Sequence, residues 1–424
     1  MKKILYLIIS ATMLSECNNP RPNDAAGRAS PKESPSKDSL SANLPTTNPS
    51  PALKGDEPGS FGYDLNFLQK HDKVVVLKSG DAQVIVSPKY QAKVFTSTAN
   101  GLSGASFGWI HYKAFDGAPD THMNAYGGEN RLWLGPEGGK FSLFFKSGAK
   151  MEIANWKTPA AFDTEPWQLK DKNETSVILQ KDMHLVNYAG TKLDLSINRE
   201  IKILDRDMIN RLFQLEPDAS IKVVGYQTIN LLKNTGKQAW TETSGMPCIW
   251  MLDMFNPGDH TTVIIPYKKD GNPKPATTDY FGEIAADRIK LADGILYFKA
   301  DGKSRGKLGI HPSAANPVAG SYDADKKILT ITLFEVNERT KYLNQEWNTT
   351  KPPFSGDAVN AYNDGPLASG TQMGPFYELE SVSPAALLPA GESMTHHHSV
   401  FHFTGNEKSL DAISKKILGV GLGL

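Results

Sequence analysis

Cysteine is scarce in this sequence: the 424 residues include only Cys17 and Cys248. Two cysteines can build neither a disulfide framework nor a multi-cysteine zinc site. The chain also lacks an excess of either charge, because 46 Lys and Arg balance 46 Asp and Glu. A nucleic-acid-binding protein normally carries a basic excess or a basic stripe, so we expect no nucleic-acid partner.

Long hydrophobic runs are lacking as well. The apolar stretch ILYLIISATML at residues 4–14 follows Met1-Lys2-Lys3. It is too short for a permanent transmembrane helix but typical of an export signal. The sequence LSEC at residues 14–17 resembles the lipobox of bacterial lipoproteins, although Glu16 stands where a small residue is expected. We therefore predict a signal peptide over residues 1–16 and lipidation at Cys17, with ordinary secretion as the alternative.

Residues 18–60 contain almost no large apolar side chains and are rich in Pro, Ser and Asn. Such a segment buries too little surface to offset the entropy lost on ordering. We predict a disordered tether over residues 17–60, which would hold the following domain away from a membrane that contains the lipid on Cys17. The predicted location is the bacterial cell envelope, in the periplasm or at the outer membrane.

Long amphipathic helical patterns are scarce from residue 61 onward. Short β-branched or aromatic runs alternate instead with Gly, Asn, Asp and Pro turns, without a break or a fixed repeat. This pattern predicts an all-β fold, one large antiparallel β-supersandwich over residues 61–406, followed by a short helical tail over 407–424. We expect a monomer. The runs expected to form strands lie at residues 73–88, 150–157, 176–182, 192–205, 221–232, 261–268, 294–301 and 326–336.

The segment at residues 124–145, NAYGGENRLWLGPEGGKFSLFF, combines many glycines with polar and aromatic residues. Glycine lets the backbone approach a ligand or another strand closely. Trp133 offers a flat face for a sugar ring, Arg131 offers a planar fork of donors, and Glu137 offers a carboxylate. The alternative is a bulged strand with a buried Arg–Glu pair.

Two other segments supply polar candidates. Asn230 lies within the strand pattern of residues 224–240, where the following KNTGKQ reads as a turn. Residues 354–381 are dense in Gly, Asn and Asp and predict a long ordered loop, the usual carrier of site residues. Its polar candidates are Asp357, Asn360, Tyr362, Asn363 and Asp364.

The stretch at residues 374–403 contains two glutamates one residue apart, Glu378 and Glu380, then a turn with Glu392, then four histidines. In a strand, Glu378 and Glu380 share one face. In a second strand His396, His398 and His402 share one face, and the other carries His397 together with Phe401 and Phe403, whose apolar character suggests burial. A carboxylate and an imidazole facing one cleft could form an acid–base pair. His396 and His398 could instead reach one divalent metal, or merely line a wet face; we expect no cofactor.

These residues resemble the galactose mutarotase-like (aldose 1-epimerase-like) superfamily. Asn130-Arg131 is similar to an early motif whose arginine binds sugar there. Leu379-Glu380, followed by the turn at residues 389–392, is similar to the late strand that carries that family's catalytic base. The segments GGENRLWLGPEGG, NAYNDGP and GPFYELESVSPAALLPAGES are similar to exported superfamily members from Bacteroidetes-type bacteria. The resemblance covers roughly residues 80–405 and implies sugar chemistry.

One departure concerns the general acid. Aldose epimerases place a histidine in a mid-chain strand, whereas YQTINLL at residues 226–232 has Thr228 and Asn230 instead. Mutarotation needs an acid as well as a base. The candidates for the acid are His398, His396 and His311.

We therefore expect an exported, lipid-anchored, carbohydrate-active protein that performs acid–base chemistry on a sugar, as an aldose epimerase-like isomerase does. Glu380 is the expected base and His398 the expected acid. The expected substrate-binding residues are Arg131, Trp133, Glu137, Asn230, Asp364, Glu378 and His396. The rival hypotheses are a non-catalytic glycan-binding lipoprotein and a metal-dependent glycosidase or lyase.

Overall fold

The computed structural model describes residues 55–216, 218–269, 274–367 and 369–423. The expected signal peptide, Cys17 and most of the expected tether lie outside these residues. Residues 55–60 form turns, and the Ser60 side chain accepts a hydrogen bond from the backbone N–H of Tyr63 and thereby caps helix α1 (Phe61–Gln69). The last six residues of the expected tether thus belong to the described part of the chain.

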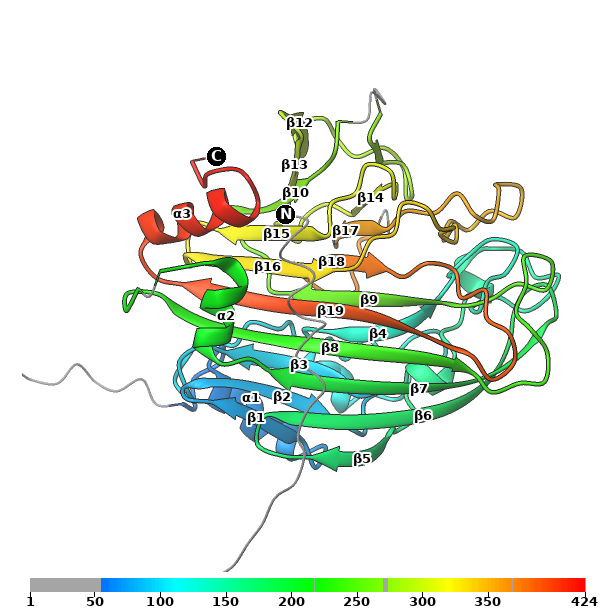
Figure 1. Ribbon diagram of the computed structural model, residues 1–424, viewed down its shortest axis with the longest axis horizontal. Helices are drawn as coiled ribbons and strands as arrows, with labels where there is room; N and C mark the ends of the chain where they lie inside the picture. Colours follow the sequence, from blue (N-terminus) through cyan, green and yellow to red (C-terminus); the bar gives the residue numbers. More distant parts are fainter. Residues whose placement is uncertain (1–54, 217, 270–273, 368, 424) are drawn as a thin grey trace, which may run out of the picture. The chain divides into compact units, whose positions relative to one another are not determined.

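The described chain folds into three sheets in which all paired strands are antiparallel (Figure 1). A small sheet consists of β1 (Val75–Ser79), β2 (Ala82–Ser87) and β3 (Lys93–Thr98). The ten-stranded sheet has the order β12 (Ile289–Ala292), β13 (Ile295–Lys299), β10 (Thr261–Pro266), β15 (Val318–Asp323), β16 (Ile328–Phe334), β19 (Ser393–Thr404), β8 (Lys222–Asn234), β7 (Lys192–Ile203), β6 (Ser176–Val186) and β5 (Gln168–Lys172). The six-stranded sheet has the order β11 (Ala276–Thr277), β14 (Gly306–Ile310), β17 (Val359–Asn363), β18 (Tyr377–Val382), β9 (Cys248–Phe255) and β4 (Arg131–Gly135).

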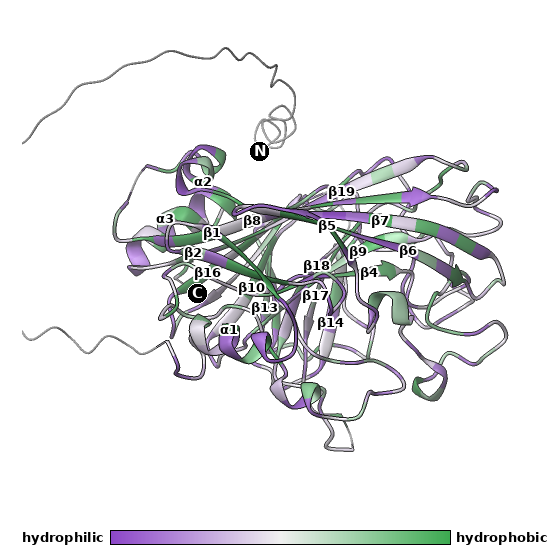
Figure 2. Ribbon diagram, turned by 90° about the horizontal axis from the view of Figure 1, so that it is seen from below, coloured by the Kyte–Doolittle hydropathy of each residue, from purple (hydrophilic) through white to green (hydrophobic). Residues whose placement is uncertain are grey.

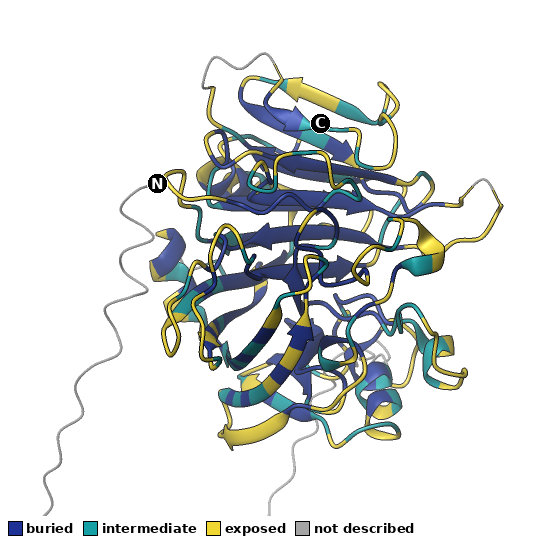
Figure 3. Cartoon of the chain, turned by 90° about the vertical axis from the view of Figure 1, so that its right-hand side faces the viewer, coloured by how far each residue is buried: buried dark blue, intermediate teal, exposed yellow. Residues whose placement is uncertain are grey.

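The two large sheets pack face to face. Side chains of β18 and β9 form hydrogen bonds with side chains of β19, and Tyr377 of β18 bonds Ser321 of β15. In the six-stranded sheet, β14, β17, β18, β9 and β4 are buried along their whole length (Figure 3), whereas β6 and β7 of the ten-stranded sheet alternate buried with more exposed residues and are banded in hydropathy (Figure 2). This is the β-sandwich class that the sequence predicts.

Helices cover the outer face of the ten-stranded sheet. Phe213 of α2 (Arg206–Phe213) packs edge-on against Phe401 and Phe403 of β19, at centroid distances of 4.8 and 5.9 Å. Helix α3 (Glu407–Ile417) follows β19 and confirms the predicted C-terminal helix. None of the helices between residues 55 and 423 that the structure describes is long and apolar enough to cross a bilayer.

Two local expectations were wrong. Residues 150–157 form no strand; they contain the 3₁₀ turn Ile153–Asn155. Residues 354–381 are not one long loop, because β17 lies inside that range and pairs with β18. Glycine and asparagine density signalled a loop, but pairing with distant neighbours on both sides stabilises β17 as a buried strand.

Candidate functional site

One face of the six-stranded sheet collects polar and aromatic side chains from strands that are far apart in sequence. Strand register places Trp133 beside Trp250, and Glu378 beside Tyr362, which in turn lies beside Lys307. Directly paired residues in antiparallel strands point to the same side of the sheet. This face lies away from the ten-stranded sheet, because Ser381, on the opposite face of β18, bonds the histidines of β19.

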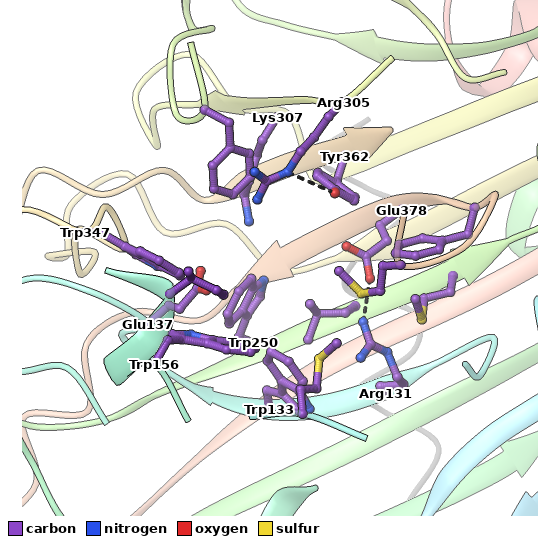
Figure 4. Close-up of a pocket in the computed structure, with 17 residues that line it drawn as sticks. Arg131, Trp133, Glu137, Trp156, Trp250, Arg305, Lys307, Trp347, Tyr362 and Glu378 are labelled. Carbon is purple, nitrogen blue, oxygen red and sulfur yellow. Dashed lines mark hydrogen bonds and ion pairs between the residues drawn. The ribbon is translucent and has the colours of Figure 1, made fainter. Parts of the chain in front are cut away.

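This face forms the floor of a cavity with two adjoining lobes, and Figure 4 shows the side chains that line one of them. The inner lobe has a volume of about 130 Å³ and the outer lobe about 380 Å³. Glu137, Arg305, Lys307 and Trp347 line both lobes. Only the inner lobe is lined by Arg131, Trp133, Trp156, Trp250 and Glu378, and only the outer lobe by Tyr280, Glu346 and Asp364.

Four tryptophans surround the inner lobe. Trp133 meets Trp250 edge to face at a centroid distance of 5.7 Å, and Trp156 stacks on Trp347 at 6.1 Å. Two of them lie in sheet strands, whereas Trp156 and Trp347 come from loops above the sheet. A small cavity with aromatic walls and a few charged groups suits a ligand that has both apolar faces and hydroxyl groups.

Glu378 is the carboxyl group that the sheet presents to the inner lobe. Its Oε1 accepts a hydrogen bond of 2.5 Å from Nη2 of Arg131, and both side chains are buried. Burial raises the pKa of Glu378 to about 7, and the negative charge of nearby Glu380 adds to this effect, although Arg131 and Lys307 oppose it. A carboxyl group with such a pKa can exist in either protonation state near neutral pH.

Glu137 enters the cavity from the loop that follows β4. Its backbone N–H donates to Oε1 of Gln345 (2.9 Å), and its carbonyl oxygen accepts a hydrogen bond from Ser142 Oγ. Burial raises the pKa of Glu137, and the charge of Glu380 contributes, while Lys307 opposes the rise. No ion pair to Glu137 forms in the described part of the chain. Figure 4 shows Glu137 and Glu378 on opposite sides of Trp250.

Glu380 does not line the cavity, although it shares a face of β18 with Glu378. Its Oε2 accepts hydrogen bonds from Trp250 Nε1 (2.8 Å) and Lys307 Nζ (3.0 Å). The ammonium group of Lys307 also lies 4.5 Å from the Trp250 ring centroid. Glu380 therefore lies beneath these two side chains and holds them in position.

The histidines of β19 lie on the wrong side of the six-stranded sheet for chemistry in this cavity. His398 is fully buried and forms two hydrogen bonds, one between its Nε2 and Asp253 Oδ2 (2.7 Å) and one between its Nδ1 and Ser381 Oγ (2.8 Å). Ser381 also bonds His396. This Ser–His–Asp arrangement resembles a catalytic triad, but it is enclosed between the sheets without access to a substrate.

His396 and Asn230 belong to the same buried layer. Burial lowers the pKa of His396 to about 3, with a further contribution from His398. Asn230 accepts a hydrogen bond from Arg199 (2.8 Å) and donates to the carbonyl of His396 (3.1 Å). Both residues therefore satisfy polar groups inside the sandwich. His397, on the other face of β19, is the half-buried one and pairs with Glu335 (3.0 Å).

The structure thus brings together only part of the predicted site. Arg131, Trp133, Glu137 and Glu378 line the inner lobe, and Asp364 lines the outer one. The expected pairing of Glu380 with His398 does not form, because the two lie on opposite faces of the sheet. His311, the other acid candidate, is exposed and bonds Ser313.

Several lining residues were not predicted, among them Trp156, Trp250, Arg305, Lys307 and Trp347. The alternation of Trp250, Leu252 and Met254 in the strand-like run CIWMLDMF was a usable signal for a shared face. The described residues contain no group of three or more His, Cys, Asp or Glu arranged to hold a metal ion.

Comparison with known proteins assigns the chain to a family. Residues 59–423 match the model of the family described as "Family of unknown function (DUF6786)", and the chain belongs to that family. No protein with a curated description matches the sequence.

Solved structures of similar fold have low sequence identity to this chain. A candidate aldose 1-epimerase from Escherichia coli K12 is 11% identical over 78% of this chain and 98% of its own, with a TM-score of 0.45. A galactose mutarotase-like protein from Lactobacillus casei is 11% identical over 78% and 99%, with a TM-score of 0.43. A protein from Synechocystis sp. PCC 6803 is 13% identical over 79% and 96%, with a TM-score of 0.44.

Proposed function

We propose that this protein binds a saccharide in the inner lobe and catalyses acid–base chemistry on it, of the kind that interconverts sugar anomers. The observation that carries this proposal is the pair of carboxyl groups with raised pKa, Glu137 and Glu378, on opposite sides of a tryptophan-walled cavity. The sequence resemblance to aldose epimerases supports the same chemistry.

The surroundings assign a role to each carboxyl group. Glu378 accepts a charge-assisted hydrogen bond from Arg131, which favours its ionised form, so it acts as the base. Glu137 forms no ion pair in the described part of the chain, and burial raises its pKa, so we assign it the role of the acid. Glu378 takes the proton of the anomeric hydroxyl while Glu137 protonates the ring oxygen. The ring C–O bond breaks, the aldehyde rotates, and reclosure returns both protons.

This assignment replaces Glu380 and His398 by Glu378 and Glu137. Glu380 becomes a positioning residue, because it holds Trp250 and Lys307 at the cavity. The tryptophans supply the faces on which a sugar ring stacks. A non-catalytic glycan-binding protein would use the same walls, and the Trp-rich lining favours this function as the second candidate.

The test is measurement of anomeric exchange by NMR over a panel of sugars, with glycan hydrolysis followed in parallel. Glu378→Gln and Glu137→Gln should each lower the exchange rate by about a hundredfold or more while the circular dichroism spectrum is unchanged. Glu335→Gln, at the half-buried carboxylate beside His397, is the matched control and should be fully active. Saccharide binding without exchange or hydrolysis would establish the binding function instead.

We also propose, from the N-terminal sequence, that the protein is exported to the cell envelope as a monomer anchored through a lipid on Cys17. Metabolic labelling with a radioactive fatty acid tests the anchor. The full chain should be labelled and sediment with membranes, and Cys17→Ala should abolish both properties. Label retained in the variant would contradict the assignment.

A further inference from the structure

Arg305 lies between the two lobes of the cavity and is held in a defined orientation. Its guanidinium carbon lies 3.8 Å from the centroid of the Phe281 ring, and its Nε donates to Tyr362 Oη (3.4 Å). Tyr362 Oη in turn donates to Asp364 (2.7 Å). The residue is exposed and lines both lobes, and Figure 4 shows its side chain beside Tyr362. Stacking and the Nε contact together fix the plane of the guanidinium group.

The other cations that line the cavity are already paired. Arg131 bonds Glu378, and Lys307 bonds Glu380. Arg305, in contrast, forms no ion pair within the described ranges, and neither of its terminal nitrogens makes a hydrogen bond there. These two nitrogens are the donors that arginine uses for bidentate binding of oxyanions.

The acidic side chains of the outer lobe do not accept hydrogen bonds from the terminal nitrogens of Arg305. Glu346 is bound by Lys351, at 2.6 Å between Nζ and Oε2. Asp364 accepts hydrogen bonds from Tyr362 Oη and from the backbone N–H of Gly374 (3.0 Å). Both carboxylates therefore have donors of their own. Glu137 also lines the outer lobe, and the charge of Arg305 opposes the rise in its pKa, but the two side chains form no ion pair in the described part of the chain. The outer lobe offers an oriented guanidinium fork with its two terminal donors available.

We propose that the saccharide bound in the inner lobe carries an anionic substituent, a carboxylate, sulfate or phosphate group, which lies in the outer lobe against Arg305. This inference rests on the proposed function, because the inner lobe must hold the sugar ring. An ordinary exposed arginine is mobile and faces solvent on all sides. Arg305 differs because an aromatic ring and a tyrosine hydroxyl orient it at the edge of a cavity.

The test compares binding of matched sugars by isothermal titration calorimetry. Galactose and glucose are each compared with their uronic acid, 6-sulfate and 6-phosphate, for the full chain and for Arg305→Met. Wild-type protein should bind at least one anionic form about tenfold to a hundredfold more tightly than the neutral parent. Arg305→Met should lose that preference and bind the neutral sugars within about twofold of wild type. The three anionic arms identify the substituent.

Two further variants make the result specific. Arg339→Met removes an exposed arginine whose backbone N–H bonds Asn337 and which lines neither lobe, and it should behave as wild type. Arg305→Lys keeps the charge without the planar fork and should retain only part of the preference. Equal affinity of wild type for neutral and anionic sugars, or equal weakening of both by Arg305→Met, would overturn the inference but leave the proposed function intact.

Failure of every sugar to bind would instead overturn the proposed function. In that case the anion site is tested by titration with inorganic sulfate alone. Binding is monitored through the fluorescence of the tryptophans that line the cavity. A saturable response that disappears in Arg305→Met would support an anion site at Arg305. Absence of a response in the wild type would overturn it.

Discussion

Arg131, on edge strand β4, reaches across β9 to bond Glu378 of β18, and both members of this ion pair are buried at the cavity floor. A buried charge is tolerated only when it is compensated. The pair therefore ties three strands together and also sets the proton affinity of the carboxyl group that faces the ligand. The same ion pair therefore contributes both to the stability of the sheet and to the chemistry of the cavity.

Removing the cation from this pair should cost stability. Arg131→Met leaves Glu378 buried without its partner, and we expect a loss of about 3 kcal/mol or more in the free energy of unfolding, measured by urea denaturation. The double variant Arg131→Met, Glu378→Gln should recover part of that loss, because no buried carboxylate remains. If the double variant loses as much as the sum of the two single variants, the pair is not coupled.

Glu378 should also make stability depend on pH in a defined direction. Its pKa rises from 4.5 to about 7 on folding, chiefly through burial. Between these values the folded protein binds a proton that the unfolded chain has released. The contribution of Glu378 to stability is therefore complete below about pH 4.5 and is lost as the pH rises through about 7.

Comparison of urea denaturation midpoints at several pH values from 4.5 to 8 checks this direction. As the pH rises, the wild type should lose stability relative to Glu378→Gln, because glutamine cannot release a proton. The control Glu335→Gln should follow the wild-type curve more closely in this region. Parallel curves for wild type and Glu378→Gln would contradict a raised pKa at this residue.

The histidines of β19 should matter for stability and not for chemistry. His398→Ala leaves the carboxylate of Asp253 buried without this partner and should cost about 3 kcal/mol or more. His397→Ala, one residue away on the half-buried outer face, should cost less than about 1 kcal/mol. Urea denaturation measures both. Saccharide binding to a folded His398→Ala protein should be unchanged, and a specific loss of turnover without destabilisation would restore His398 as the acid.

Local sequence pattern predicted the β class and the C-terminal helix, and it assigned residues to common faces. Glu378 and Glu380 do share a face of β18, and His396, His398 and His402 are all buried on one face of β19. The pattern did not reveal which face meets the other sheet. His396, His398 and His402 were expected to face a cleft, a metal ion or solvent, yet they form the polar interior of the sandwich, while helix α2 covers the face of Phe401 and Phe403.

The composition of the site depends on pairings that local sequence does not encode. Lys307 and Glu380 are 73 positions apart and meet because β14, β17 and β18 are neighbours in one sheet. Arg131 and Glu378 are 247 positions apart. Glu378 faces the cavity, whereas Glu380 lies beneath Trp250 and Lys307. The two glutamates look equivalent in the sequence because they alternate on one strand face. Their different positions are set by the side chains on the neighbouring strands.

The position of Glu137 should depend on the absence of a side chain at Gly138. A Cβ atom built on Gly138 would lie 2.2 Å from the carbonyl oxygen of Glu346, so the two loops could not keep their present separation. The backbone N–H of Gly138 also donates to the carbonyl oxygen of Gln345 (3.1 Å), which holds the loops together. Gly138→Ala should therefore destabilise the protein by about 1–3 kcal/mol and displace the carboxyl group of Glu137.

The variant should lower the anomeric exchange rate at saturating sugar more than it weakens sugar binding, because the tryptophan walls remain while the acid moves. Gly117→Ala is the matched control, since its new Cβ would meet nothing closer than 3.6 Å, and it should retain wild-type stability and activity. Urea denaturation together with NMR exchange measurements separates the two effects. Wild-type exchange in Gly138→Ala would show that Glu137 does not act from this loop, because an acid shifted with its backbone could not keep its place at the ring oxygen.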